Sequence, residues 1–185
     1  MGARATLTEE YVRQLLNYNH ETGVFTWKER APDMFVDGER HAEWQCRNWN
    51  SKHAGTAAGT INSKGYVLII IVRIGYYAHR LAWLYMTGQW PEADIDHTNG
   101  DRSDNRFCNL REATHTENMR NARKRLDNTS GVKGVCWDNQ TNKWRASIRV
   151  AGKRLYLGYF SSREDAAAAY ERAACEHHGE FARTE

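Results

Sequence analysis

The stretch from Asp94 to Asn118, DIDHTNGDRSDNRFCNLREATHTEN, constrains the fold of this chain more than any other. Ile95 to His97 has the composition of a strand end, and a loop rich in Asn, Gly, Asp and Ser follows over residues 98–106. Residues 109–111 then return as a second strand. The stretch therefore predicts two short strands joined by a polar loop.

A helix is expected directly after the second strand. Thr114 is placed as its N-cap, and Glu117 completes a capping box. If the strands pair and the helix packs across them, four polar side chains should converge. They are Asp96, His97, Asn109 and Asn118.

These four side chains have the chemistry that phosphodiester hydrolysis requires. The Asp96 carboxylate and the Asn118 amide oxygen are hard ligands that suit Mg²⁺ or Mn²⁺, ions that keep several waters and also bind a substrate phosphate. His97 could take a proton from water as general base, while Asn109 holds the other ring nitrogen and sets the tautomer. Taken singly, each residue is better explained as an ordinary surface, turn or helix residue. Their spacing and flanking sequence favour a nuclease.

The order Asp-His, eleven residues, Asn, eight residues, Asn resembles that of the HNH (ββα-metal) nucleases, and above all the phage-type HNH homing endonucleases. The string from His79 to Asn121 is similar to that family almost throughout. The resemblance implies that Asp96 and Asn118 bind the metal, that His97 is the general base and that Asn109 orients it. It also implies 5′-phosphate and 3′-hydroxyl product ends. Asn118 stands where many members carry a final His, a variation that the homing subgroup tolerates.

Composition indicates a globular protein with an uneven charge distribution. The 185 residues suffice for one large domain or two small ones, and 26% of them are charged. Residues 1–119 hold 13 Lys and Arg against 15 Asp and Glu, whereas residues 120–185 hold 13 against 8. A basic C-terminal third beside a nuclease-like centre favours a nucleic-acid contact there, although basic faces are usually only solvated.

Cysteine spacing and hydropathy argue against several classes of protein. The four cysteines lie far apart without a CxxC pair, which argues against a zinc ribbon or a disulfide framework and favours a reducing cytosol. The longest apolar run, residues 67–72, is too short to cross a bilayer. We therefore expect no membrane association.

The segments before the motif are expected to form a helix, strands and an irregular insert. Thr8 should cap an amphipathic helix, and residues 24–27 read as a strand. Residues 30–53 show no period and are interpreted as a loop or irregular insert. Residues 55–78 predict a hairpin or meander whose long strand, 66–73, breaks at Gly75. A short helix is expected over 79–86.

A basic run follows the motif helix. Arg120, Arg123 and Lys124 cluster before a linker over residues 127–131. The run could neutralise DNA phosphates, or it could be a solvated helix end with favourable dipole placement. The neighbouring motif favours DNA contact.

The pattern changes to period two after the linker. In residues 144–150 apolar side chains alternate with Arg145, Ser147 and Arg149, and residues 154–160 are expected to alternate again. An alanine-rich helix over 162–176 should pack on one face of the resulting sheet. A three-stranded sheet with arginines on its open face could enter a major groove, or the face could simply be solvated.

Residues 131–183 resemble the DNA-binding domain of plant Apetala and ethylene-response factors, through GVKGVCWD, NKWRASIR, KRLYLGYFSSREDAAAAYERAA and HGEFA. Cys136 stands where that family usually has a groove-reading Arg, and Tyr156 replaces a Trp, so base preference does not carry over. The resemblance implies DNA contacts from Lys133, Trp137, Arg145, Ser147, Arg149, Arg154 and Tyr156.

We therefore expect an α+β fold in which a ββα-metal HNH nuclease domain precedes a small three-stranded antiparallel sheet plus helix that binds DNA. The expected boundaries are 1–53 for the N-terminal helix, strand and insert, 54–126 for the nuclease core, 127–131 for the linker and 132–185 for the Apetala/ERF-like DNA-binding domain.

The expected function is metal-dependent, site-selective cleavage of double-stranded DNA with Mg²⁺ or Mn²⁺, by a monomer or weak homodimer encoded by a phage or mobile element and acting in the bacterial cytoplasm. One alternative is a non-catalytic regulator with a vestigial nuclease core. Another is a less specific phage nuclease or nickase. Since each chain has one such site, a double-strand break would need a dimer or two successive events.

Overall fold

The structure is a computed structural model that describes residues 7–121 and 128–182. The chain divides into two compact units, residues 1–112 and residues 113–185. Both mix helices with antiparallel sheets, so the expected α+β class is confirmed, including the three-stranded sheet plus helix near the C-terminus.

The first unit opens with helix α1 (Glu9–Leu15), which runs directly into a hairpin of β1 (Leu16–Asn19) and β2 (Val24–Trp27). The Thr8 side chain accepts a hydrogen bond from the Tyr11 amide, so the expected N-cap is confirmed. The Asn19 side chain accepts hydrogen bonds from the amides of the β1–β2 turn.

The expected irregular insert over residues 30–53 is wrong. The segment contains a 3₁₀ turn (Pro32–Met34) and helix α2 (Ala42–His53). The structure describes all of the α2 residues, and only Cys46 among them is buried. The helix therefore has no apolar stripe by which its sequence could have predicted it. Polar contacts hold the helix. The Asn50 side chain accepts a hydrogen bond from the Arg30 amide and donates one to the Arg30 carbonyl, both at 2.9 Å. The Arg30 guanidinium lies 3.8 Å from the ring centre of Trp49.

The expected meander is present, but its second turn, which joins the second and third strands, was misplaced. Strands β3 (Thr60–Ile61), β4 (Val67–Ile71) and β5 (Ile74–Tyr77) form an antiparallel sheet. A two-residue turn joins β4 to β5, with positive φ at Val72 (48°) and Arg73 (62°), while Gly75 pairs with Ile70 inside β5. Such turns usually carry Asn-Gly, so Val-Arg gives no turn signal, and Gly75 gave a false one.

Helix α3 (Ala78–Thr87) covers the expected segment and ends at Gly88, whose φ of +77° suits a left-handed C-cap. Its apolar side packs into the core of the first unit, and Trp83 packs against Phe107 of the motif loop at 5.6 Å between ring centres. The largest fully buried side chains of this core are Val12, Leu16, Phe25, Ile69, Ile71, Leu81 and Leu84.

The motif stretch forms the expected strand, loop, strand and helix in order, but the second strand begins at Leu110, and Asn109, which was expected to open it, lies in a 3₁₀ turn. Strand β6 (Asp94–His97) pairs with β7 (Leu110–Ala113) across a loop that closes in a 3₁₀ turn (Phe107–Asn109). Helix α4 (His115–Asn121) follows. The Glu117 carboxylate accepts a hydrogen bond from the Thr114 backbone amide at 2.8 Å, and the Thr114 hydroxyl accepts one from the Glu117 backbone amide at 3.3 Å. This pair of hydrogen bonds confirms the capping box.

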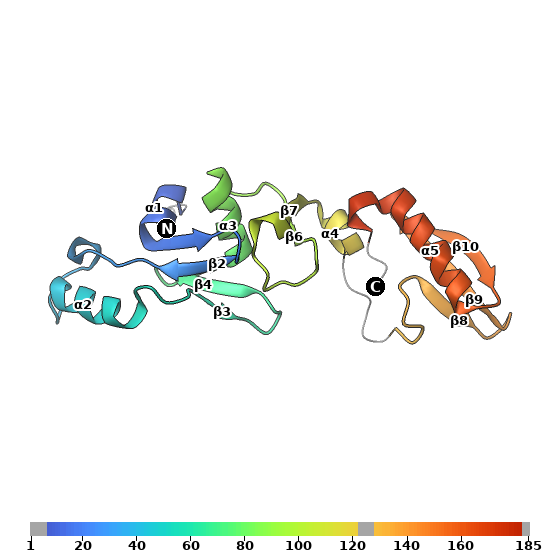
Figure 1. Cartoon of the computed structure of the whole chain (residues 1–185), viewed down its shortest axis with the longest axis horizontal. Helices are drawn as coiled ribbons and strands as arrows, with labels where there is room; N and C mark the ends of the chain where they lie inside the picture. The colour runs from blue at the N-terminus through green and yellow to red at the C-terminus, as the bar shows by residue number, and fades with distance from the viewer. Residues whose placement is uncertain (1–6, 122–127, 183–185) are drawn as a thin grey trace, which may run out of the picture. The chain divides into compact units, whose positions relative to one another are not determined.

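The second unit contains the antiparallel sheet β10–β9–β8 and helix α5, which runs along one face of it (Figure 1). The strands are β8 (Val135–Asp138), β9 (Lys143–Val150) and β10 (Lys153–Phe160), and α5 spans Arg163–His178. Alanines of the helix pack on Ala146 and Ile148. Gly134, with φ +74°, is required because a Cβ there would lie 2.2 Å from the ring of Tyr170.

Within the described ranges, none of the helices combines the length and the apolar character that a transmembrane span requires.

Candidate active site and DNA-binding surface

Asp96 and Arg111 form a buried ion pair between the two motif strands. The Arg111 Nε and Nη2 atoms donate to the same Asp96 oxygen at 3.0 and 2.9 Å. The Asp96 and Arg111 side chains are only 5% and 16% exposed, respectively. The sequence analysis named Asp96 but missed Arg111. The one clue to Arg111 was its positive charge on the strand expected to pair with that of Asp96.

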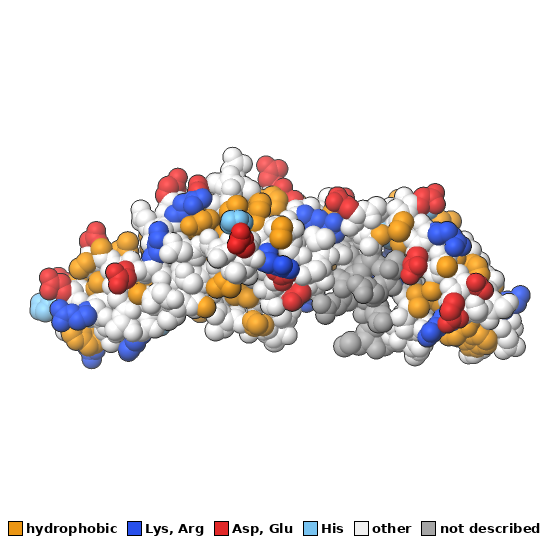
Figure 2. Space-filling view, viewed as in Figure 1, with side chains coloured by type: hydrophobic (Ala, Val, Ile, Leu, Met, Phe, Trp, Pro, Cys, Tyr) orange, Lys and Arg blue, Asp and Glu red, His pale blue; other side chains and the backbone are white. Residues whose placement is uncertain are grey.

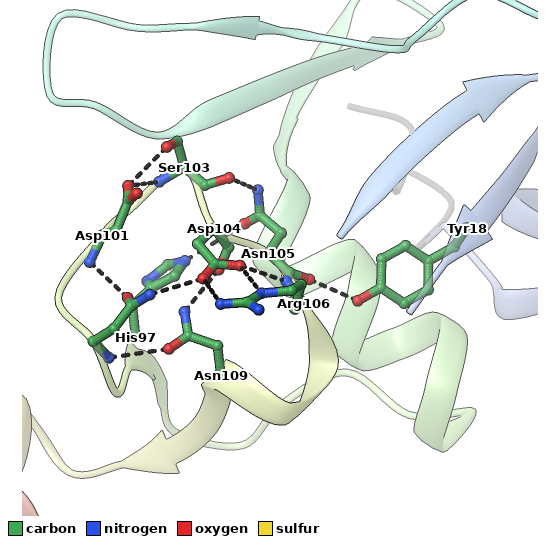
Figure 3. A network of polar contacts seen from close by, with 9 residues as sticks. Tyr18, His97, Asp101, Ser103, Asp104, Asn105, Arg106 and Asn109 are labelled. Atoms are coloured by element: carbon green, nitrogen blue, oxygen red, sulfur yellow. Dashed lines mark hydrogen bonds and ion pairs between the residues drawn. The ribbon is translucent and has the colours of Figure 1, made fainter. Parts of the chain in front are cut away.

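His97 lies at the end of β6 and contacts Asn105 of the motif loop (Figure 3). Its Nε2 atom is 3.5 Å from the Asn105 Oδ1 atom, at the long end of hydrogen-bond range. The Asn105 amide nitrogen donates to the Ser103 carbonyl at 3.0 Å, which assigns Oδ1 to the His97 side. Because Oδ1 can only accept, this contact favours the tautomer with the hydrogen on Nε2, which leaves Nδ1 as the basic nitrogen of the ring.

Asn109, the residue expected to orient His97, instead holds the motif loop. Its Oδ1 atom accepts from the Asn99 amide at 3.0 Å, and its Nδ2 atom donates to the Asp104 carbonyl at 2.8 Å. Asp104 in turn pairs with Arg106 at 2.6 Å (Figure 3). Asn109 therefore ties the loop to the start of β7, and the contact to the His97 ring comes from Asn105.

The His97 ring lies in a buried aromatic environment. Both His97 (4% exposed) and His79 (6%) are buried, with ring centres 5.0 Å apart in an edge-on contact. Burial lowers the pKa of His97. The hydrogen bond to Asn105 and three nearby carboxylates act in the opposite direction, but burial has the larger effect. Burial, with His97 and Arg80, lowers the pKa of His79 to about 3. Both imidazoles are neutral near pH 7.

Asn118 and Arg120 lie on α4 in the second unit, both half-buried. Asp96, His97 and Asn109 belong to the first unit, where the structure brings them together. The basic residues Arg123 and Lys124 lie outside the described residues.

The metal donors that the motif offers are one buried carboxylate and amide oxygens. Over residues 7–121 and 128–182, no three His, Cys, Asp or Glu side chains lie close enough together to hold a metal ion. A zinc-type site would need such a cluster. Mg²⁺ is held by one or two carboxylates with waters and substrate phosphates, so the chemistry of Asp96 and Asn118 fits an ion of this type.

The open face of the C-terminal sheet carries most of the expected DNA contacts. In β9, Ala146 and Ile148 are buried, whereas Arg145, Ser147 and Arg149 lie on the opposite face. Pairing places Tyr156 beside Ser147 and Arg154 beside Arg149. The face opposite α5 is therefore rich in Arg and aromatic groups, as a surface for DNA requires.

A bulge adds Tyr159 to this open face. The register shifts between Tyr156 and Gly158, so that Tyr159 pairs with Arg145 and Phe160 turns towards the core. Strict alternation over 154–160 was therefore wrong at its end. The signal was Gly158, since a glycine inside a strand often marks a bulge, and its φ is +128°.

Two of the residues expected to contact DNA have protein neighbours. Trp137 pairs with Trp144, and the two rings meet edge-on at 5.2 Å, which places Trp137 on the helix side of the sheet, 44% exposed. The Lys133 ammonium donates to the Arg120 carbonyl at 2.6 Å, in the last turn of α4.

Comparisons with known proteins match two segments of the chain to known families. A family model described as HNH endonuclease matches residues 76–120, and one described as AP2 domain matches residues 130–180. The chain is 34% identical to protein 3.8 of Escherichia phage T7 over 108 residues, which are 57% of this chain and 87% of that protein. It is 46% identical over 54 residues to an ethylene-responsive transcription factor-like protein of Arabidopsis thaliana, covering 28% of this chain and 23% of that protein. No solved structure matches.

Proposed function

Because this chain belongs to the HNH endonuclease family and carries an AP2 DNA-binding domain after the HNH segment, we propose that it is a metal-dependent, site-selective DNA endonuclease of the homing type. The observation that carries the proposal is the buried Asp96–His97 pair at the end of β6, with the His97 ring contacting Asn105. A general base beside a carboxylate ligand is what metal-assisted phosphodiester hydrolysis uses.

His97 acts as the general base in this proposal. With the hydrogen on Nε2, Nδ1 accepts a proton from a water whose oxygen attacks the scissile phosphorus. The bond from phosphorus to the 3′ oxygen breaks, which gives 5′-phosphate and 3′-hydroxyl ends. The lowered pKa of His97 keeps the ring in its base form at neutral pH.

Asp96 and Asn118 are the residues proposed to hold a divalent ion, Mg²⁺ or Mn²⁺. Bound there, the ion would supply Lewis-acid stabilisation of the charge that develops on the phosphate. Arg111 supplies compensating charge to Asp96 and fixes the direction of its carboxylate. Asn109 keeps the motif loop closed around His97.

The AP2 domain is proposed to select the cleavage site on double-stranded DNA. Arg145, Ser147, Arg149, Arg154 and Tyr156 would contact the major groove from the open sheet face, and Arg120, Arg123 and Lys124 would contact phosphates. Lys133 and Trp137, of which Trp137 lies on the helix side of the sheet, remain further proposed contacts. One active site per chain cuts one strand at a time, so a monomer would nick DNA, and a weak homodimer could cut both strands.

Cleavage of a supercoiled plasmid library tests the proposal. Incubation with Mg²⁺, with Mn²⁺ or with EDTA should give nicked or linear plasmid in the metal samples alone. End-labelling should find 5′-phosphate at the cut. Tight binding to the plasmids without cutting in either metal would contradict the enzyme and favour a non-catalytic regulator.

A further inference from the structure

The β1–β2 hairpin holds one side of the motif loop. The Tyr18 hydroxyl donates to the Asn105 carbonyl at 2.6 Å, from a residue 87 positions earlier in the chain. The Phe107 amide donates to the His20 carbonyl at 3.2 Å. Two hydrogen bonds from one hairpin thus fix the backbone on either side of Arg106.

The hairpin turn also packs directly on this loop backbone. Gly23 has a φ of +73°, and a Cβ built on it would lie 2.4 Å from the Arg106 nitrogen and 2.5 Å from the Asn105 carbonyl carbon. Any side chain at position 23 would therefore displace the loop. The absence of a side chain at Gly23 lets two backbones touch.

Tyr18 is itself rigidly held. Its ring stacks on Phe25 with centres 4.6 Å apart and meets Tyr85 edge-on at 5.6 Å. Burial raises the pKa of the Tyr18 hydroxyl, so the group stays protonated and remains a donor. Its hydrogen bond to the loop is thus kept over the whole range in which a nuclease works.

The loop residue that Tyr18 holds is the one in contact with His97. Asn105 is 2% exposed, and its side chain lies between the Ser103 carbonyl and the His97 ring (Figure 3). On the other side, Asn109 fixes the Asp104 carbonyl. Position 105 is therefore held from the N-terminal hairpin and from the start of β7 at once.

We propose that the β1–β2 hairpin is part of the nuclease site, and that Tyr18 and Asn105 are positioning residues that set the orientation and tautomer of the His97 ring. The inference rests on the proposed role of His97 as general base. It assigns a function to an N-terminal segment that lies outside the matched HNH region.

The physical basis is the sensitivity of a long hydrogen bond to loop position. Without the Tyr18 hydroxyl, the Asn105 carbonyl loses its donor in a buried segment. The loop then shifts to reach water or another donor. A contact of 3.5 Å between His97 and Asn105 does not survive a further displacement of a few tenths of an ångström.

The test compares Tyr18→Phe and Asn105→Ala with Tyr85→Phe, a control that changes another tyrosine of the same aromatic cluster. Single-turnover cleavage by Tyr18→Phe should fall by about tenfold, since small misplacements of catalytic groups cost one to two orders of magnitude. DNA affinity should not change. Asn105→Ala should lose at least as much, and Tyr85→Phe should cut like wild type.

The second readout is independent of cleavage. At one fixed neutral pH, ¹⁵N spectra of the His97 ring should show the Nε2–H tautomer in wild type and in Tyr85→Phe. In Tyr18→Phe and Asn105→Ala the two nitrogen shifts should move towards each other as the tautomers mix.

Identical His97 spectra in wild type and Tyr18→Phe would overturn the inference, whether or not the protein cuts DNA. Full cleavage by Tyr18→Phe beside an inactive His97→Ala protein would also overturn it and leave the proposed function intact. If wild type fails to cut any DNA, the proposed function fails, and the spectra alone decide the inference.

Discussion

At the scale of single residues, the Asp96–Arg111 pair links stability to the proposed metal site. Both groups are nearly buried, and the Arg111 guanidinium balances the charge of the carboxylate. Removing one member of such a pair leaves an uncompensated buried charge, which is costlier than losing an exposed ion pair. A cation bound at Asp96 would supply a replacement charge.

Arg111→Met should therefore destabilise the metal-free protein by about 3 kcal/mol in urea unfolding. Addition of Mg²⁺ should restore part of this loss, and should stabilise the variant more than wild type. Arg106→Met is the matched control, because Arg106 is 46% exposed in its pair with Asp104 and should cost less than about 1 kcal/mol. Equal losses in the two variants would contradict the assignment.

His79 gives the first unit a pH-dependent stability. Its ring is buried, and its Nδ1 atom has no hydrogen-bond partner within the described residues. The pKa falls from 6.5 to about 3 on folding, so the unfolded chain binds a proton more readily than the folded one. The stabilising contribution is complete above pH 6.5 and is lost progressively as the pH falls towards 3.

We predict that wild type loses roughly 2 kcal/mol through His79 between pH 6.5 and pH 5, at about 1.4 kcal/mol per pH unit. His79→Phe should show a shallower loss over the same range, measured by urea unfolding at each pH. His41→Phe, which replaces a histidine with a 94% exposed side chain, should keep the wild-type slope. Parallel curves for wild type and His79→Phe would refute the effect.

The motif spacing was sufficient to single out Asp96, His97 and Asn109 as candidates, because the identity and order of these residues fit the chemistry proposed for the site. It could not name Asn105, Arg111 or Tyr18. Their roles depend on the backbone path of the loop and on a hairpin far away in sequence, and neither leaves a local pattern.

At the scale of elements, the open face of the β8–β9–β10 sheet is the surface proposed to bind DNA. Arg145 lies at its centre, between Cys136 and Tyr159 on the neighbouring strands, and its Nη2 atom is 3.4 Å from the Cys136 sulfur. Arg149 is more exposed and lies further along the same strand. Alternation within β9 predicted both positions, because a half-buried strand leaves a clear period.

Arg145→Ala and Arg149→Ala should each weaken binding to the cleavage site by about tenfold or more. A variant that no longer neutralises one DNA phosphate should also show a slope of log affinity against log salt that is shallower by about 0.9. Arg172→Ala, on the exposed side of α5, is the control and should bind like wild type. Unchanged binding in both sheet variants would refute the DNA-binding role of this face.

Elements without an apolar period were the ones that sequence reasoning missed. Helix α2 is held by Asn50, Arg30 and tryptophan rings, and acidic and basic side chains both lie over this region (Figure 2, left). The Val72-Arg73 turn is held by the pairing of its strands, against the preference of its residues. In both places tertiary contacts outweigh local propensity.

At the scale of the whole molecule, the proposed function separates DNA recognition from cleavage. The HNH segment holds His97, the proposed base, and the Asp96 carboxylate, and the AP2 domain has a sheet face rich in arginine. The proposed domain boundaries, 54–126 and 132–185, keep these roles in different parts of the chain. A substitution of His97 alone should therefore abolish cleavage without weakening the affinity for DNA.

The central claim is tested most directly by single-turnover cleavage of a mapped DNA site by His97→Ala, with binding of the same DNA measured in parallel. We predict that cleavage falls by about 10² or more, the usual scale for loss of a general base, while DNA affinity stays at the wild-type value. His41→Ala should behave as wild type. A purified, folded His97→Ala protein that cuts as fast as wild type would contradict the account.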